Sequence, residues 1–226
     1  MKTKRSVLCG LSEGNNRWTR FGVIAWALLV GMCAPLARSA LPDLKINASR
    51  LILTVKVVSR TFSDTDCELQ DGCVRGTGVR KLLLFDFGIV NTGRGDLVIG
   101  DPLNWPDLYR YDECHGHYHA QGLMLFKLLR LNYLPAAKTH KPGFCFRDDK
   151  PYMGSTKPSH GYSCGDNQGI SSGWQDIYDS DLPCQYIDVT GVPRGKYYLS
   201  VKINNTRVFA ESNYLNNQVI IPVTIP

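Results

Sequence analysis

Apolar and polar residues alternate along several short segments of this chain, which indicates β-strands. Within residues 197–203, large apolar side chains at every second position alternate with tyrosine, serine and lysine. A period of two residues places the apolar side chains on one face of a half-buried strand. Residues 51–58, 82–90 and 219–225 are rich in branched and aromatic residues, so we predict further strands there.

Turn-forming sequences separate these segments, namely Asn-Thr-Gly-Arg-Gly at 91–95 and Val-Pro-Arg-Gly at 192–195. No apolar repeat of 3.6 residues continues for three turns. Residues 135–182 are rich in Gly, Pro, Ser, Asp, Tyr and Cys, and such a long loop region inside a domain is usually functional. Without internal repeats or linkers, residues 40–226 are predicted to form a single, mainly β domain, a β-sandwich with long disulfide-braced loops.

The first 39 residues have the composition of an export signal. Basic residues precede the apolar run 21–37 (FGVIAWALLVGMCAPLA), and small residues stand before a predicted cleavage site near Ser39 or Ala40. A retained membrane anchor is the alternative, but about 17 residues are at the short end for spanning a bilayer. We therefore expect residues 1–39 to be a signal peptide. The mature domain would be secreted, or periplasmic in a bacterium, with no membrane span.

Removal of this leader changes the charge of the protein. The whole chain carries a formal charge of +6, but the leader holds six basic residues and one acidic residue, so the mature domain carries +1. No later run of Lys and Arg resembles a phosphate-binding patch. Near-neutral charge without such a patch excludes nucleic acid as the expected partner.

Six of the eight cysteines remain after removal of the leader: Cys67, Cys73, Cys114, Cys145, Cys164 and Cys184. An even number in an exported chain indicates three disulfides, although six cysteines can pair in fifteen ways. Proximity in the sequence alone would join Cys67 to Cys73. Zinc ligation is the alternative, but the mature chain contains no C-x2-C pair.

His115, His117 and His119 are three of the five histidines in the chain. Neutral imidazole is the commonest protein ligand for Cu, Zn, Ni and Fe, so the cluster indicates a metal site. Alternate residues of a β-strand project from one face, whereas the same spacing on a helix would spread over about 400° of arc. The cluster is therefore predicted to bind metal in an extended segment.

The chain must bend for these histidines to share one ion. In a flat strand the Cα atoms of His115 and His119 would lie about 13 Å apart, whereas a metal–nitrogen bond is about 2 Å long. Gly116 tolerates unusual backbone angles, so we expect a bend or bulge there. Three solvent-facing histidines on an edge strand are the alternative.

Longer motifs resemble the catalytic domain of lysyl oxidases, the copper amine oxidases that deaminate peptidyl lysine. The similarity covers nearly all of residues 41–220. Its motifs are LPDL at 41–44, CHGHYH at 114–119, HKPGFC at 140–145, QGISSGWQDIY at 168–178, DLPCQYIDVT at 181–190 and ESNYLNN at 211–217. The Cys-His-x-His-x-His motif combined with Gln-Tyr-Ile-Asp-Val-Thr is specific to this family.

The resemblance implies that His115, His117 and His119 bind copper. It also implies that Lys141 and Tyr178 form lysine tyrosylquinone: copper and O2 oxidise the tyrosine to a quinone, and the lysine amine adds to the ring. We therefore expect an exposed phenol ring close to the copper. Taken alone, each residue has an ordinary explanation, since a lysine is usually a solvated surface charge and a tyrosine in a Gly-rich loop usually packs.

The same resemblance implies the disulfides Cys67–Cys114, Cys73–Cys184 and Cys145–Cys164. It further implies a Ca²⁺ site made of oxygen donors. Its ligands would be Asp43, the Leu44 carbonyl, Glu211, Asn213, Asn216 and Asn217. Family members usually carry Asp where Asn213 stands, which lowers the ligand charge and should weaken calcium binding. An Asn-rich hairpin turn is the alternative.

The implied activity is a copper- and quinone-dependent oxidation of primary amines, namely the ε-amine of lysine in extracellular proteins or small amines, to aldehydes. O2 is the oxidant, and NH3 and H2O2 are released. Asp176, two residues before Tyr178, is the candidate base that removes the α-proton; a turn-stabilising aspartate is the alternative. Vertebrate members carry a histidine after the copper motif where this chain has Phe126. The rival functions are a secreted copper-binding protein without turnover and a β-sandwich adhesion module.

Overall fold

The structure is a computed structural model that describes residues 40–114, 116–140 and 145–226. The predicted signal peptide, His115 and Lys141 lie outside the described residues, and so do the side chains of His117 and His140. None of the helices formed by the described residues has the length and apolarity needed to cross a membrane.

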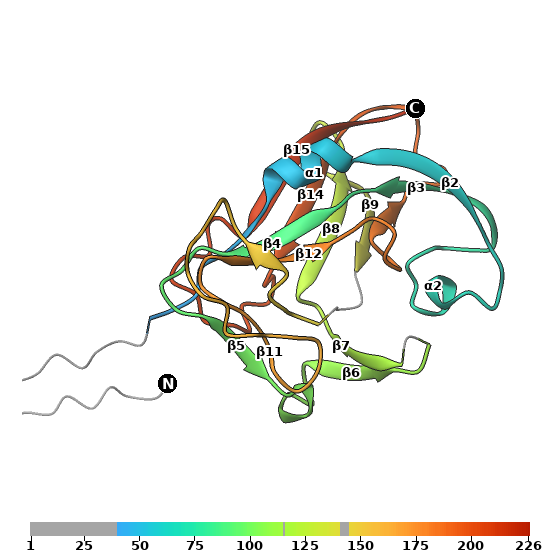
Figure 1. Cartoon of the computed structure of the whole chain (residues 1–226). Helices are drawn as coiled ribbons and strands as arrows, with labels where there is room; N and C mark the ends of the chain where they lie inside the picture. Colours follow the sequence, from blue (N-terminus) through green and yellow to red (C-terminus); the bar gives the residue numbers. More distant parts are fainter. Residues whose placement is uncertain (1–39, 115, 141–144) are drawn as a thin grey trace, which may run out of the picture. The chain divides into compact units, whose positions relative to one another are not determined.

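Two four-stranded antiparallel sheets provide most of the framework (Figure 1). One has the order β1-β4-β12-β10, formed by Leu44–Ile46, Phe87–Asn91, Trp174–Tyr178 and Lys150–Pro151. The other has the order β15-β14-β8-β9, formed by Gln218–Ile225, Gly195–Ile203, Met124–Leu129 and Pro135–His140. The mainly β prediction is therefore confirmed, and the described residues belong to one domain.

Three smaller sheets and three short helices complete the described part of the fold. The sheets have the orders β13-β3-β2 (Tyr186–Asp188, Gly78–Leu84, Lys56–Phe62), β11-β5 (Gln168–Ile170, Leu97–Gly100) and β6-β7 (Tyr109–Asp112, His117–Ala120). The helices are α1 (Ala48–Thr54), α2 (Cys67–Gln70) and the 3₁₀ turn η1 (Pro102–Asn104). The β6–β7 hairpin carries part of the histidine cluster.

Aromatic rings join the two large sheets through the core. Phe126 on β8 meets the rings of Phe85 and Phe87 edge-on, with centroid separations of 4.9 Å and 5.6 Å. Phe87 in turn stacks on Tyr178 of β12 at 4.8 Å. All four side chains are at most 2% exposed. The core therefore extends up to the ring of Tyr178 and fixes its plane.

Shortening Phe126 to Ala should be among the most destabilising single changes in the core. The substitution removes the ring that Phe85 and Phe87 both contact, and large-to-small changes of this kind cost about 3–5 kcal/mol. Urea unfolding at equilibrium measures the loss. Leu53→Ala is the control, because Leu53 is 83% exposed and its truncation should change stability by less than about 0.5 kcal/mol.

Two of the strand predictions need correction. Residues 51–54, predicted as strand, belong to α1, because the side chain of Asn47 caps that helix by accepting the N–H of Arg50 at 3.3 Å. Residues 82–90 form parts of β3 and β4 rather than one strand, with Phe85 and Asp86 between them. The alternating segment 197–203 and the segment 219–225 are confirmed as strands, within β14 and β15.

The long segment 135–182 is more ordered than its composition indicates. It contains the short strands β9, β10, β11 and β12, of which β12 lies inside a sheet between β4 and β10. Its residues pair with partners far away in the sequence, for example Tyr178 with Phe87. Such long-range pairing is invisible to local periodicity.

The three implied disulfides are confirmed: Cys67–Cys114, Cys73–Cys184 and Cys145–Cys164. Pairing by proximity, which would join Cys67 to Cys73, is wrong. The first bond attaches α2 to the turn of the β6–β7 hairpin, and the third closes a loop of the 135–182 segment. Disulfides in these positions brace the loops that carry the candidate site, and they fit an oxidising compartment.

Candidate active site

A cavity of about 710 Å³ lies where the β6–β7 hairpin, the Cys145–Cys164 disulfide and β12 come together. Its lining includes Asp101, Leu103, Tyr111, Gly116, Tyr118, Arg147, Asp166, Gln168, Asp176 and Tyr178. Both described members of the predicted catalytic set, Asp176 and Tyr178, are therefore wall residues of one cavity. A concave, largely apolar pocket with a few converging polar groups is the usual form of a small-molecule site.

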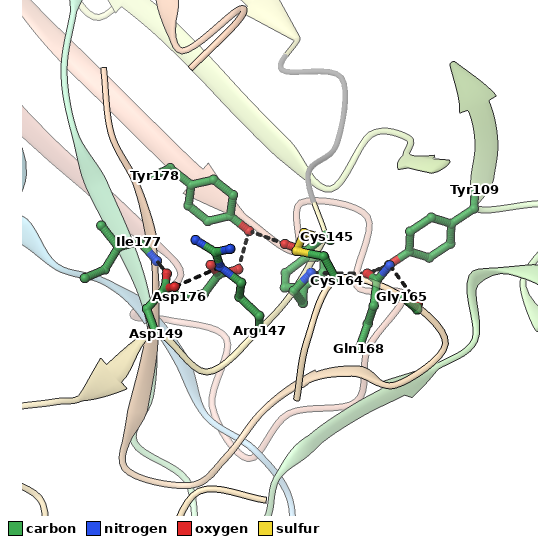
Figure 2. The surroundings of a disulfide bond; sticks show 11 residues. Tyr109, Cys145, Arg147, Asp149, Cys164, Gly165, Gln168, Asp176, Ile177 and Tyr178 are labelled. Atoms are coloured by element: carbon green, nitrogen blue, oxygen red, sulfur yellow. Dashed lines mark hydrogen bonds and ion pairs between the residues drawn. A yellow bond between two sulfur atoms is a disulfide. The ribbon is translucent and has the colours of Figure 1, made fainter. Parts of the chain in front are cut away.

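Tyr178 presents its hydroxyl to two acceptors (Figure 2). The hydroxyl lies 2.5 Å from Oδ2 of Asp176 and 3.2 Å from the carbonyl oxygen of Cys145. The two residues at positions 176 and 178 share one face of β12, because side chains of a strand alternate. The expectation of an exposed phenol ring is wrong: the side chain is 2% exposed, since the ring stacks on Phe87.

Burial controls the protonation of this pair. Desolvation raises the pKa of Asp176 well above that of an ordinary aspartate; the hydrogen bond from Tyr178 opposes this rise, and the charge of Asp149 adds to it. Desolvation, followed by the charge of Asp176 and the hydrogen bond to it, raises the pKa of Tyr178 well above 10. A buried carboxyl group with a raised pKa that faces a cavity is a candidate general acid or base.

Residues 147–149 hold β12 in position from one side. Asp149 accepts the N–H of Ile177 at 2.6 Å through Oδ2 and contacts Nε of Arg147 at 2.8 Å through Oδ1. The N–H of Asp149 donates to the carbonyl of Gln175. This arrangement keeps the Arg147 guanidinium close enough to lower the pKa of Asp176 in part (Figure 2).

Gln168 connects the disulfide segment to the histidine hairpin. Its Oε1 accepts both the N–H of Phe146 at 3.1 Å and the hydroxyl of Tyr109 at 3.2 Å (Figure 2). Tyr109 begins β6, and Phe146 follows Cys145, whose carbonyl accepts from Tyr178. The candidate cofactor tyrosine and the hairpin are thus linked through three hydrogen bonds and the peptide bond between Cys145 and Phe146.

The hairpin itself has the bend that the sequence predicted. Gly116 has a φ of +68° and lies in the turn before β7. Its N–H donates to the carbonyl of Asp112, and the N–H of Cys114 donates to Oδ1 of the same residue at 2.9 Å. His117 and His119 occupy alternate backbone positions of β7.

His119 is buried, with 2% of its side chain exposed. Its Nδ1 lies 3.0 Å from Oδ2 of Asp112. Sequence reasoning gave Asp112 no role, and neither did it give one to Asp149 or Gln168. The sequence could have indicated a contact between Asp112 and His119. If a tight turn pairs residue 112 with residue 117, residue 119 becomes the diagonal neighbour of residue 112.

A group of potential metal donors elsewhere in the described part of the chain brings together Asp71, Cys73 and Cys184. The two cysteines are bonded to each other as a disulfide. Their sulfur atoms are therefore unavailable as thiolate ligands, and the group carries no metal proposal.

The predicted calcium ligands come together at the start of β1. Asp43 accepts the side-chain amide of Asn216 at 2.8 Å, while Glu211 accepts that of Asn217 at 2.7 Å and the N–H of Leu44 at 2.7 Å. Burial raises the pKa of Glu211, although its hydrogen bonds oppose the rise. Asn213 differs, because its side chain accepts the N–H of Leu215 as in an ordinary turn.

Two amide oxygens of this cluster have the donor chemistry of cation ligands. Oδ1 of Asn216 and Oδ1 of Asn217 are buried and accept no hydrogen bond from any described residue. Buried polar atoms are normally paired, and two orphaned oxygens beside two carboxylates match the hard oxygen ligands that Ca²⁺ prefers.

Comparisons with known proteins match the chain to one family. The family model described as lysyl oxidase matches residues 44–225. Lysyl oxidase homolog 2 of Homo sapiens is 34% identical over 187 residues, which cover 78% of this chain and 23% of that protein. Lysyl oxidase homolog 2A of Danio rerio is 35% identical over 184 residues, with 78% and 24% covered. The chain thus spans about a quarter of the length of these relatives.

Proposed function

The chain belongs to the lysyl oxidase family, and we propose that it is an exported, copper- and quinone-dependent oxidase of primary amines. The observation that carries this proposal is the environment of Tyr178. Its hydroxyl contacts a buried carboxyl group and the carbonyl of Cys145, in a cavity that the histidine hairpin also lines. A buried structural tyrosine also needs a hydrogen-bond acceptor, so the feature that supports a chemical role is the cavity beside its ring.

Lys141 is the proposed partner of Tyr178. This lysine lies four positions before Cys145, whose carbonyl oxygen lies 3.2 Å from the Tyr178 hydroxyl. Four residues span at most about 14 Å even when fully extended. The Cys145–Cys164 disulfide anchors the near end of this segment, so covalent geometry limits the Cα atom of Lys141 to within about 14 Å of that of Cys145.

His115, His117 and His119 are the proposed copper ligands. The donor chemistry fits, because neutral imidazole nitrogen is a preferred ligand of Cu(II), and the hairpin that carries these residues bends at Gly116 as the ligand spacing requires. Bound copper and the mature quinone would together supply the oxidation of the amine by O2.

The protein's own residues would orient the substrate and move its proton. Asp176 accepts the α-proton of the bound amine, which the raised pKa of its carboxyl favours. Phe87 holds the ring of position 178 in one plane through the stacking contact. Asp101 and Asp166, which line the cavity, attract a cationic amine toward it.

We propose the ε-amine of lysine in extracellular proteins as the substrate class, with small primary amines as the alternative. A hydrogen peroxide assay of the copper-reconstituted protein, with lysine peptides and free diamines offered in parallel, tests the activity. Peroxide release that requires both amine and copper is the expected result. A protein that binds one copper per chain and releases no peroxide would be a copper-binding protein without turnover. Loss of copper binding as well would leave the adhesion module.

Asp43, Glu211, Asn216 and Asn217 form the Asp43–Glu211 cluster. Calcium bound to this cluster should raise the melting temperature of the protein. A ligand present at 100 times its Kd stabilises by about 2.7 kcal/mol, and each kcal/mol raises the Tm of a domain of this size by about 2–4 °C. Thermal unfolding in calcium and in a chelator measures the shift. Glu211→Gln should abolish this shift. It should also lower the calcium-free Tm, because the amide NH2 cannot accept the hydrogen bonds that a Glu211 oxygen accepts, so the test compares the calcium-dependent shift and not the absolute Tm.

Asp64→Asn is the matched control, since Asp64 is exposed and distant in sequence from the cluster. This variant should keep the full calcium response. A calcium-dependent shift of equal size in Glu211→Gln would contradict the site.

A further inference from the structure

Asp112 makes three contacts that organise the histidine hairpin. Its carbonyl accepts the N–H of Gly116 at 2.8 Å, and its Oδ1 accepts the N–H of Cys114 at 2.9 Å. Its second carboxylate oxygen, Oδ2, lies 3.0 Å from Nδ1 of His119. One residue therefore contacts both the backbone of the turn and an imidazole ring of the strand that follows it.

The hairpin register explains why this contact forms. Asp112 pairs with His117, so His119 is its diagonal neighbour on the same face of the ribbon. The side chains of Asp112 and His119 are 13% and 2% exposed, so little water competes for the ring nitrogen. The contact is thus set by the fold rather than by chance at a solvated surface.

We propose that Asp112 is a positioning residue for the copper site: its carboxylate accepts the Nδ1 proton of His119 and so directs the lone pair of Nε2 to the metal. A neutral imidazole carries one proton, and the partner of one nitrogen decides which nitrogen is left to ligate. A carboxylate in this position also fixes the ring orientation and makes the ligand more basic. The inference rests on the proposed function, because it assumes copper at His119.

Asp112→Asn tests the role with little change of shape. When the amide oxygen faces the N–H of Cys114, the amide NH2 faces His119 and favours the wrong tautomer; the flipped amide loses the Cys114 contact instead. Copper affinity, measured by competition with a chromophoric chelator, should fall by about 10–100-fold, as it does for other partners of ligating histidines. Glu113→Gln is the matched control, since it removes the same charge from an exposed neighbour and should change affinity by less than about twofold.

The tautomer of His119 separates positioning from a merely structural role. In ¹⁵N NMR spectra of the copper-free protein, wild-type His119 should carry its proton on Nδ1. In Asp112→Asn the proton should move to Nε2 in the molecules whose amide oxygen still faces the N–H of Cys114. A turn cap that acts only on the backbone would not move this proton. The wild-type spectrum remains informative even if the variant fails to fold.

Copper affinity of Asp112→Asn within twofold of Glu113→Gln would overturn the proposal, and so would an Nε2 proton on His119 in the wild type. Neither readout requires turnover. A protein that shows both expected effects and never forms a Lys141–Tyr178 bond would refute the proposed oxidase while leaving the role of Asp112 intact.

Discussion

Replacement of Tyr178 by Phe should reduce amine oxidation to the level of the copper-free protein. The phenol oxygen is the atom on which the proposed quinone depends, and Phe cannot supply it. Phe preserves the stacking on Phe87, so the loss would reflect chemistry rather than a collapsed cavity. Peroxide release per copper-loaded chain measures the effect.

The same substitution should also destabilise the fold by about 1–3 kcal/mol, because it leaves the buried carboxyl group of Asp176 without the Tyr178 hydroxyl. Tyr162→Phe is the matched control. The Tyr162 hydroxyl also donates to a carboxylate, that of Asp96. Burial, followed by the charge of Asp96, raises the pKa of Tyr162 to about 12. Its removal should leave turnover unchanged. Substantial activity in Tyr178→Phe would exclude a quinone at this position.

Asp176→Asn should lower kcat/KM by about 10²–10⁴-fold, the usual contribution of a general base. Asn is nearly isosteric and can still accept the Tyr178 hydroxyl, but it cannot take a proton from the substrate. The rate should be expressed per chain that carries the Lys141–Tyr178 bond, so that failure to form the cofactor is not counted as slow chemistry. Asp181→Asn, at an exposed position three residues after Tyr178, should retain wild-type rates.

The pH profile provides a second test of Asp176. A carboxyl group accepts a proton only when it is ionised, and burial raises its pKa above the ordinary value of about 3.9. The wild-type kcat/KM should therefore rise with pH along an acid limb that lies above the ordinary aspartate range. Asp176→Asn should lose that limb. If the acid limb persists in the variant, a group other than Asp176 causes it.

The elements with a clear sequence period were predictable. The alternation in residues 197–203 specifies β14, because one buried face is needed whatever the partner strand. Helix α1 was not predictable from its branched residues, since a cap at Asn47 decides its start, and the same Asn47 amide donates to Gln175 across the fold. The three disulfides followed from the family resemblance alone and not from spacing.

The candidate site, too, was only partly predictable from the sequence. The histidine spacing required a bend, and the structure has it at Gly116. The burial of Tyr178 was not predictable, because it depends on the register of β12 with β4. The contact between Asp112 and His119 depends on the register of β6 with β7, and the sequence indicates it only if a tight turn joins residues 112 and 117. Register is a tertiary property that a local pattern does not encode.

Peptide mapping of the mature protein, expressed with copper and purified in air, tests the central claim most directly. We predict one species whose mass combines the peptides of Lys141 and Tyr178 through the quinone bond, and we predict its loss in Tyr178→Phe. Recovery of both residues in linear peptides at full yield, from protein that holds one copper per chain, would contradict the proposed oxidase.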